Sequence, residues 1–191
     1  MVEIEINYDG ELRCSAKHGL SGAIIETDAR QPQDIAVDGD GNMYVAQYGA
    51  GQNADGALLK FDPNGELVWS VGPFPGPVMG VTIDNSGYIY AAGSLGCSYN
   101  DSCDDQIKKF DSNGNLLLTF GSMPSTNGCF SDVKPRTIEF GPDGNLWVGV
   151  GNSCTISHSG NNYNGVSMIQ KYSTGGSLIS SFGSFGEDIS F

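Results

Sequence analysis

A short segment of the chain occurs three times, and this repetition limits the folds open to it more than any other feature. Each copy reads as an apolar strand, a tight turn of Asp, Asn and Gly, and a second apolar strand. The copies are residues 34–46, 80–92 and 137–149. Because Val, Ile, Tyr and Trp are typical of strands, each copy predicts a β-hairpin.

A second repeated segment follows each of these hairpins. Its copies are residues 60–72, 109–121 and 171–183, and each begins with Lys followed by an aromatic residue. Four short strands repeated at about 40–50 residues form the blade of a β-propeller. A single blade exposes both faces of its sheet, so it must stack on a neighbour to bury a core. The sequence therefore predicts an all-β chain with three four-stranded antiparallel blades, near 32–77, 78–134 and 135–191.

The composition agrees with this and excludes other classes. The chain has 191 residues, 28 of them glycine, and a formal net charge of −13. Repeated turns account for many of the glycines and aspartates. The glycines do not follow the Gly-X-Y period of a collagen. The acidic charge repels phosphate backbones, so we expect no nucleic-acid partner. No apolar run reaches the roughly 18 residues of a membrane-spanning helix.

The repeats resemble NHL repeats, the blades of NHL-type β-propellers. The segment 34–38 with Gly41 and the run 42–46 matches the first half of that pattern, and 59–62 with Gly65 matches the second. Residues 107–111 and 169–172 match the second half again. The resemblance covers about residues 32–191. The linkers between the second and third strands of the units are longer than in the family.

The first thirty residues lie outside the repeats. Residues 2–8 alternate apolar and polar, Asp9 and Gly10 form a hairpin turn, and residues 11–17 provide a return strand. We therefore expect an N-terminal β-hairpin segment over 1–30, followed by the blades over 31–191. Residues 1–29 resemble the N-terminal hairpin of the OsmC-like thiol peroxidases. The redox helices of that family have no counterpart here, so Cys14 is not predicted to be catalytic.

Three blades are fewer than the four to eight that close a propeller ring. The sequence leaves three arrangements open: a fragment of a longer propeller, an open arc capped by the N-terminal hairpin, or a homodimer that completes a six-bladed ring. An open arc would leave apolar blade faces uncovered at its ends.

The long polar segments are expected to share one face of the blades, where a rigid scaffold would present them for binding. They are residues 48–57, 93–105, 121–135 and 151–167. A protein or glycan ligand is the predicted partner of this face, and the alternative is a set of solvated loops. The candidate binding residues are Tyr48, Tyr99, Asp101, Asp104, Asp105, Arg136, His158 and Tyr163.

We expect no cofactor, but two acidic segments contain residues of the kind that bind cations. Asp38, Asp40 and Asn42 alternate as oxygen ligands do at the start of a calcium loop, but the distal glutamate is missing. The competing interpretation is an ordinary repeat turn. Asp101, Asp104 and Asp105 lie together and could hold Ca²⁺ or another divalent cation, or form a solvated acidic loop.

The positions of the cysteines indicate the cellular location of the protein. Cys97, Cys103, Cys129 and Cys154 lie in polar loop segments and are candidates for two disulfides, the alternative being free thiols. Disulfides favour an extracellular or periplasmic location, yet residues 1–6 show no signal peptide.

Two functions follow from these patterns. The first is a non-enzymatic binding module that uses the long-loop face. The alternative is part of a metal-dependent lyase or hydrolase with a site in the central channel. Glu139 is the single catalytic candidate, because it is an acid on a predicted innermost strand where the repeat alignment puts Val37 and Ile83. A solvated carboxylate is the simpler explanation of Glu139.

Overall fold

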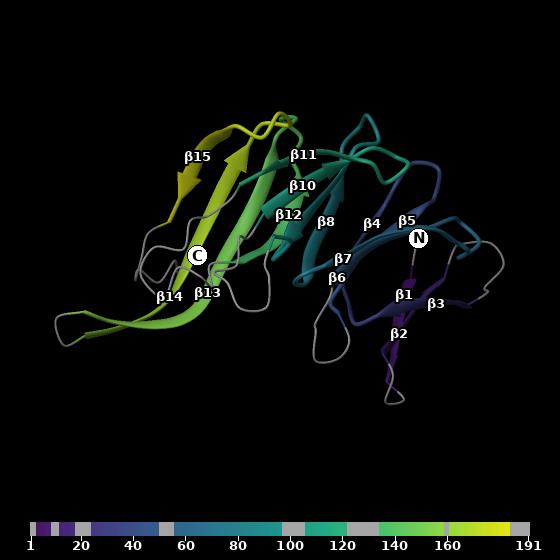
Figure 1. The fold of residues 1–191 in the computed structure, drawn as a ribbon, viewed down its shortest axis with the longest axis horizontal. Coiled ribbons are helices and arrows are strands. Elements are labelled where there is room, and N and C mark those ends of the chain that lie inside the picture. The colour runs from purple at the N-terminus through teal and green to yellow at the C-terminus, as the bar shows by residue number, and fades with distance from the viewer. Residues whose placement is uncertain are drawn as a thin grey trace.

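The computed structural model shows an all-β chain (Figure 1). It describes residues 3–8, 12–17, 24–49, 56–96, 106–121, 134–158 and 161–183, with side chains described in 31–49, 56–96, 106–121, 135–151 and 168–183. Three of its sheets have four antiparallel strands, and in each sheet the strands lie in chain order. The expected fold class, an incomplete set of propeller blades, is therefore confirmed.

The blade strands follow the predicted hairpins closely. The first blade holds β4 (Pro32–Val37), β5 (Met43–Gln47), β6 (Gly56–Phe61) and β7 (Leu67–Phe74). The second holds β8 (Val78–Ile83), β9 (Ile89–Gly93), β10 (Gln106–Phe110) and β11 (Leu116–Phe120). The third holds β12 (Lys134–Phe140), β13 (Leu146–His158), β14 (Asn161–Tyr172) and β15 (Leu178–Phe182).

A shared turn chemistry explains why these hairpins form. At the start of the β4–β5 turn, Oδ1 of Asp38 accepts hydrogen bonds from the backbone N–H groups of Asp40 and Asn42. The turn then needs a left-handed residue, and Gly41 supplies it at φ 85°. Asp62, Asp84 and Asp111 accept the same pair of backbone N–H groups in their own turns.

The first strands of the three blades lie next to one another, and the outer strands spread apart like a fan (Figure 1). We call the face of a blade that points to the next blade along the chain its trailing face, and the opposite face its leading face. One apolar cluster joins the trailing face of the first blade to the leading face of the second. A second cluster joins the second and third blades in the same way.

Two hydrogen bonds link the innermost strands across these seams. Oδ2 of Asp34 on β4 accepts from the N–H of Val81 on β8 at 2.9 Å. Oγ1 of Thr82 on β8 accepts from the N–H of Phe140 on β12 at 3.3 Å. The first and second blades therefore each use one trailing-face side chain to satisfy a backbone donor of the following blade.

The outer strand of one blade contacts a turn glycine of the next blade. A Cβ on Gly114 would lie 3.0 Å from a methyl of Val71, and one on Gly176 would lie 2.8 Å from the ring of Phe120. Both glycines belong to the turn between the third and fourth strands of their blade. The absence of a side chain there lets the blades approach closely.

Two features differ from the expectation. The N-terminal segment has three strands rather than a hairpin: β1 (Glu3–Tyr8), β2 (Leu12–Lys17) and β3 (Ile24–Arg30) form one antiparallel sheet. The segment 151–167, expected as a loop, continues β13 and β14 as a paired ribbon with Thr155 opposite Asn164. Its alternating polar residues conceal the pairing, because neither face of the ribbon carries an apolar pattern.

The leading face of the first blade is already covered. Its residues Met43, Val45, Leu59 and Phe61 form a third apolar cluster, and Phe61 is only 1% exposed. Strand β3 of the N-terminal sheet contacts β5 of this blade. At the other end of the arc, by contrast, Phe182 on β15 is 51% exposed.

Candidate functional site

Most of the loop-face candidates lie where the structure does not describe a side chain. Tyr99, Asp101, Asp104 and Asp105 fall in 97–105, outside the described residues. His158 and Tyr163 lie on β13 and β14, but only their backbone is described. The four disulfide candidates Cys97, Cys103, Cys129 and Cys154 are likewise without described side chains. These predictions therefore stay predictions.

Two loop-face candidates are described, and they lie apart. Arg136 is an exposed residue within β12 rather than on a loop. Tyr48 follows β5 and is half-buried, and its backbone N–H donates to the carbonyl of Gln31 at 3.0 Å. Neither residue belongs to a described cluster of polar groups.

The Asp38 segment behaves as a turn. Besides its two backbone donors, the carboxylate of Asp38 accepts from Nδ2 of Asn42 at 2.8 Å and from the hydroxyl of Tyr44 at 3.1 Å, both at Oδ2. Burial would raise the pKa of Asp38, but these hydrogen bonds together hold it below the usual value. Both carboxylate oxygens thus serve the turn, as they do in Asp111.

Glu139 is exposed on β12, the innermost strand of the third blade. The strand register corrects its predicted equivalents. Glu139 pairs with Trp147 as Ala36 pairs with Tyr44 and Thr82 pairs with Tyr90. Ala36 and Thr82 are therefore the true counterparts, and Val37 and Ile83 correspond to Phe140. The one-residue difference matters because alternate strand residues point to opposite faces of the sheet.

Glu139 begins a row of side chains that crosses the whole third blade. Register pairs Glu139 with Trp147, Trp147 with Lys171, and Lys171 with Ser180. We call these four residues the trailing row of the third blade. Side chains opposite one another on neighbouring strands stand about 5 Å apart, so each group of the row, in the order carboxylate, indole, ammonium and hydroxyl, lies beside the next.

The same row exists in the other blades, where the next blade covers it. It reads Ala36, Tyr44, Lys60 and Trp69 in the first blade, and Thr82, Tyr90, Lys109 and Leu118 in the second. In every row the Lys ammonium lies over the aromatic ring, at 5.2 Å for Lys60, 5.1 Å for Lys109 and 4.9 Å for Lys171 from the ring centroid. Such cation–π contacts attract electrostatically.

Sequence reasoning missed this row, although a signal for it was present. The Lys–aromatic start of each second hairpin recurs at Lys60, Lys109 and Lys171. Its partner aromatics Tyr44, Tyr90 and Trp147 recur too, but only the register shows that they meet.

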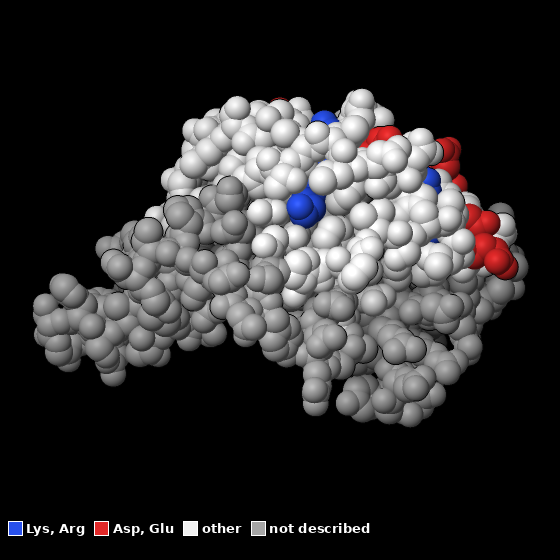
Figure 2. Space-filling view, in the orientation of Figure 1, with Lys and Arg blue, Asp and Glu red and all other residues white. Residues whose placement is uncertain are grey.

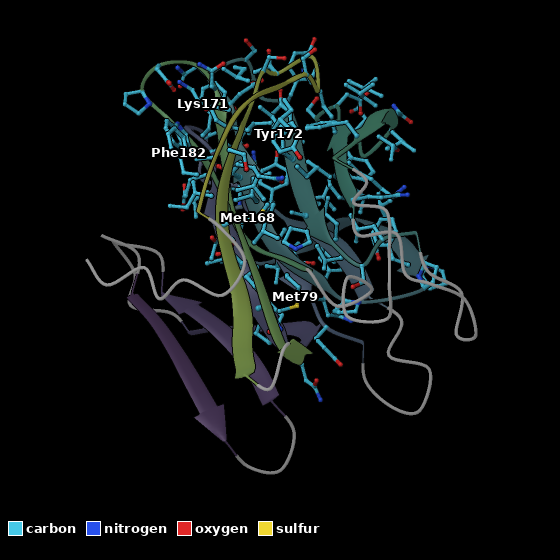
Figure 3. All side chains as sticks on the ribbon, turned by 90° about the vertical axis from the view of Figure 1, so that its left-hand side faces the viewer. Met79, Met168, Lys171, Tyr172 and Phe182 are labelled. Carbon is cyan, nitrogen blue, oxygen red and sulfur yellow. The ribbon has the colours of Figure 1, made fainter. Side chains whose placement is uncertain are left out.

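Lys171 also forms an ion pair. Its Nζ lies 2.5 Å from Oδ2 of Asp143 in the β12–β13 turn. This hydrogen bond is the main reason that the pKa of Asp143 falls to about 2, with further donors in Asn145 and Trp147. In Figure 3 the third blade faces the viewer with Lys171 and Phe182 on it. The rings of Trp147 and Phe182 are stacked, with centroids 6.1 Å apart and planes 14° from parallel.

Metal ligands do not gather in the described part of the chain. No group of three or more His, Cys, Asp or Glu side chains is placed there to hold an ion. Within the same residues, no helix has the length and apolar character needed to cross a bilayer.

Comparison with known proteins supports the fold and changes the functional conclusion. No family model matches the chain. No curated protein matches it. Among solved structures, a eukaryotic initiation factor is similar with a TM-score of 0.56 at 15% identity, over 98% of this chain and 43% of that one.

Two further similar structures are enzymes. A gluconolactonase from Xanthomonas campestris has a TM-score of 0.55 at 13% identity, over 96% of this chain and 62% of that one. A periplasmic gluconolactonase from Pseudomonas aeruginosa has a TM-score of 0.52 at 10% identity, over 100% of this chain and 69% of that one. The chain thus spans between two fifths and about two thirds of these proteins.

At such identities the likeness demonstrates the propeller-type fold. Nothing in the comparisons names the NHL family in particular. The enzymes among the similar structures nevertheless favour the catalytic alternative, so the expectation of a non-enzymatic binding module is wrong and is replaced.

Proposed function

We propose that the chain is part of a β-propeller hydrolase whose general base is Glu139, on β12, the innermost strand of the third blade. The observation that carries the proposal is the exposed carboxylate of Glu139 on an innermost strand, where the other blades hold Ala36 and Thr82. The NHL-type assignment of the repeats, which rests on their sequence pattern, belongs to the same proposal.

The substrate class we propose is a lactone, the cyclic ester of a sugar acid, because two of the similar structures are gluconolactonases. Glu139 would take a proton from a water molecule as that water attacks the carbonyl carbon. The tetrahedral intermediate then collapses, the ring C–O bond breaks, and the leaving alkoxide takes the proton back from Glu139. General-base catalysis of this kind contributes about 10²- to 10⁴-fold to the rate.

Neighbouring groups in the trailing row suit this chemistry. The indole of Trp147 gives an apolar surface next to the carboxylate, and the ammonium of Lys171 lies beyond it. That ammonium is paired with the carboxylate of Asp143, so no stabilisation of the developing oxyanion is assigned to it.

The test is hydrolysis of glucono-1,5-lactone followed by titration of the acid released, with the spontaneous rate subtracted. We expect Glu139→Gln to lower kcat by about 10²-fold or more while the protein stays folded by circular dichroism. Glu66→Gln is the matched control, since Glu66 is exposed in a turn of the first blade. A wild-type rate equal to the spontaneous rate, or an unchanged rate in Glu139→Gln, would overturn the proposal.

A further inference from the structure

The outer strand of every blade begins with two exposed apolar residues. The pairs are Leu67 with Val68 on β7, Leu116 with Leu117 on β11, and Leu178 with Ile179 on β15. Each of these side chains is 50–53% exposed, and we call them together the outer band. Among the residues with described side chains, the other large apolar residues that are exposed are Val37, Tyr88 and Phe182. The same register in each blade means that the repeat itself presents the outer band.

The first seam brings the first two pairs of the outer band near one another. Gly114, two residues before Leu116, lies so close to β7 that a Cβ on it would be 3.0 Å from a methyl of Val71. Val71 is four residues after Leu67, and a strand rises by about 3.3 Å per residue. With the step across the seam added, the two pairs lie within about 25 Å of each other. One elongated partner can therefore contact both pairs.

Acidic side chains flank the first two pairs but not the third. Asp62 and Glu66 lie in the turn before the first pair, and Asp111 lies in the turn before the second. The N–H of Glu66 lowers the pKa of Asp62, and the side-chain amide of Asn115 lowers that of Asp111, so both are ionised at neutral pH. The turn before the third pair, residues 173–177, contains no charged residue. The turns that precede the outer band are therefore acidic in the first two blades and uncharged in the third.

The charge of this surface limits the kind of partner that fits it. The ammonium of Lys60 is held in the first seam, where it donates to the carbonyl of Ser112 at 3.3 Å and lies 5.2 Å from the centroid of the Tyr44 ring. Figure 2 shows the Asp and Glu residues gathered toward the end where β4 and β5 lie. Such a surface repels nucleic-acid phosphates and anionic lipid headgroups and attracts Lys and Arg. The exposed Leu and Val side chains beside it require an apolar counterpart as well.

We propose that the outer band of the first two blades binds a basic amphipathic helix of a partner protein. The apolar stripe of that helix lies on the first two pairs of the outer band. Lys and Arg side chains at the margins of the stripe pair with the acids of the two turns. A helix of about 18 residues is roughly 27 Å long and so spans both pairs. The outer band lies on fourth strands, whereas Glu139 lies on a first strand, so the proposal goes beyond the hydrolase activity and does not depend on it.

Fluorescence anisotropy with labelled peptides tests the charge and the apolar requirement. The probe is a helical peptide of Lys and Leu about 18 residues long, and two control peptides replace its Lys by Glu or its Leu by Ser. We expect the Lys–Leu peptide to bind at least about 10-fold more tightly than either control, with an affinity that falls as salt is added. No binding of the Lys–Leu peptide, or equal binding of a control peptide, would overturn the proposal. Preferential binding of vesicles of anionic lipid would overturn it in favour of a membrane surface.

Two double variants at matched positions locate the contact. Leu67→Gln with Leu116→Gln should raise the Kd of the Lys–Leu peptide by about 10-fold or more, because each of the first two pairs loses an apolar anchor. Leu178→Gln with Ile179→Gln removes side chains of similar exposure beside the uncharged turn and should leave the Kd unchanged. Glu66→Gln should weaken binding chiefly at low salt. Equal effects of the two double variants would contradict the assignment. Because the readout is peptide binding, failure of this proposal can be told apart from failure of lactone hydrolysis.

Discussion

Oδ2 of Asp34 accepts a hydrogen bond from the backbone N–H of Val81 and so joins the innermost strands of the first two blades, 47 residues apart in the chain. Oδ1 of the same carboxylate accepts from the N–H of Ile35 at 2.9 Å. Burial raises the pKa of Asp34, and the two backbone donors oppose that rise. The carboxylate thus satisfies donors on both sides of one seam.

Replacing Asp34 should weaken the first seam. Asp34→Ala leaves the buried N–H of Val81 without its acceptor, and we expect the free energy of unfolding in urea to fall by about 2 kcal/mol. Asp34→Asn retains one acceptor oxygen and should fall between Ala and wild type. Asp40→Ala, an exposed acid in the adjacent turn, should change stability by less than about 0.5 kcal/mol. Equal losses for Asp34→Ala and Asp40→Ala would contradict this role.

Alanine in place of Gly176 should cost more than alanine in place of Gly144. Both glycines have positive φ, 84° and 75°, so each change incurs backbone strain of about 1 kcal/mol. A Cβ at Gly144 meets nothing within 4 Å, whereas one at Gly176 lies 2.8 Å from the Phe120 ring. Overpacking of this seam adds about 1–3 kcal/mol, measurable by denaturant unfolding. Equal effects would mean that the second seam is not closely packed.

The hydroxyl of Tyr90 should contribute to stability through Asp84. It donates to Oδ2 of Asp84 at 2.9 Å, and both residues are buried. Tyr90→Phe leaves that carboxylate oxygen without its donor, so unfolding should become easier by about 1–3 kcal/mol. Tyr88→Phe serves as control, because Tyr88 is 37% exposed and keeps its ring contact with Lys109. A larger loss in the control would refute the assignment.

The ion pair of Asp143 with Lys171 predicts a pH dependence. The pKa of Asp143 is about 2 in the folded protein, below its ordinary value of 3.8, so the ionised form is favoured by folding. Its contribution to stability is complete above about pH 5 and declines as the pH falls through 3.8 toward 2. NMR titration of the Asp143 carboxyl carbon should show a midpoint near 2. In Lys171→Met the midpoint should move up toward 3.8, and an unmoved midpoint would exclude Lys171 as the cause.

Local patterns were sufficient to predict the blades. The apolar pairs of strands, the turn aspartates and glycines such as Gly41 are encoded within a few residues of one another, so the hairpins follow from short-range chemistry. The same reasoning failed at the ribbon of β13 and β14, where Thr155 and Asn164 pair without an apolar face. It also compared Glu139 with Val37 and Ile83, one residue out of register, and a shift of one residue exchanges the two faces of a strand.

The sequence by itself determined the local units: three pairs of hairpins, their turn residues and the all-β class. Only the tertiary structure decided which of those units contact one another and which side chains they bury. It brought Asp34 to Val81 and Gly176 to Phe120, assembled the row from Glu139 to Ser180 across four strands, and left Phe182 exposed while covering Phe61. The physical reason is that strand pairing and blade stacking join residues tens of positions apart, and burial depends on which neighbouring sheet is present.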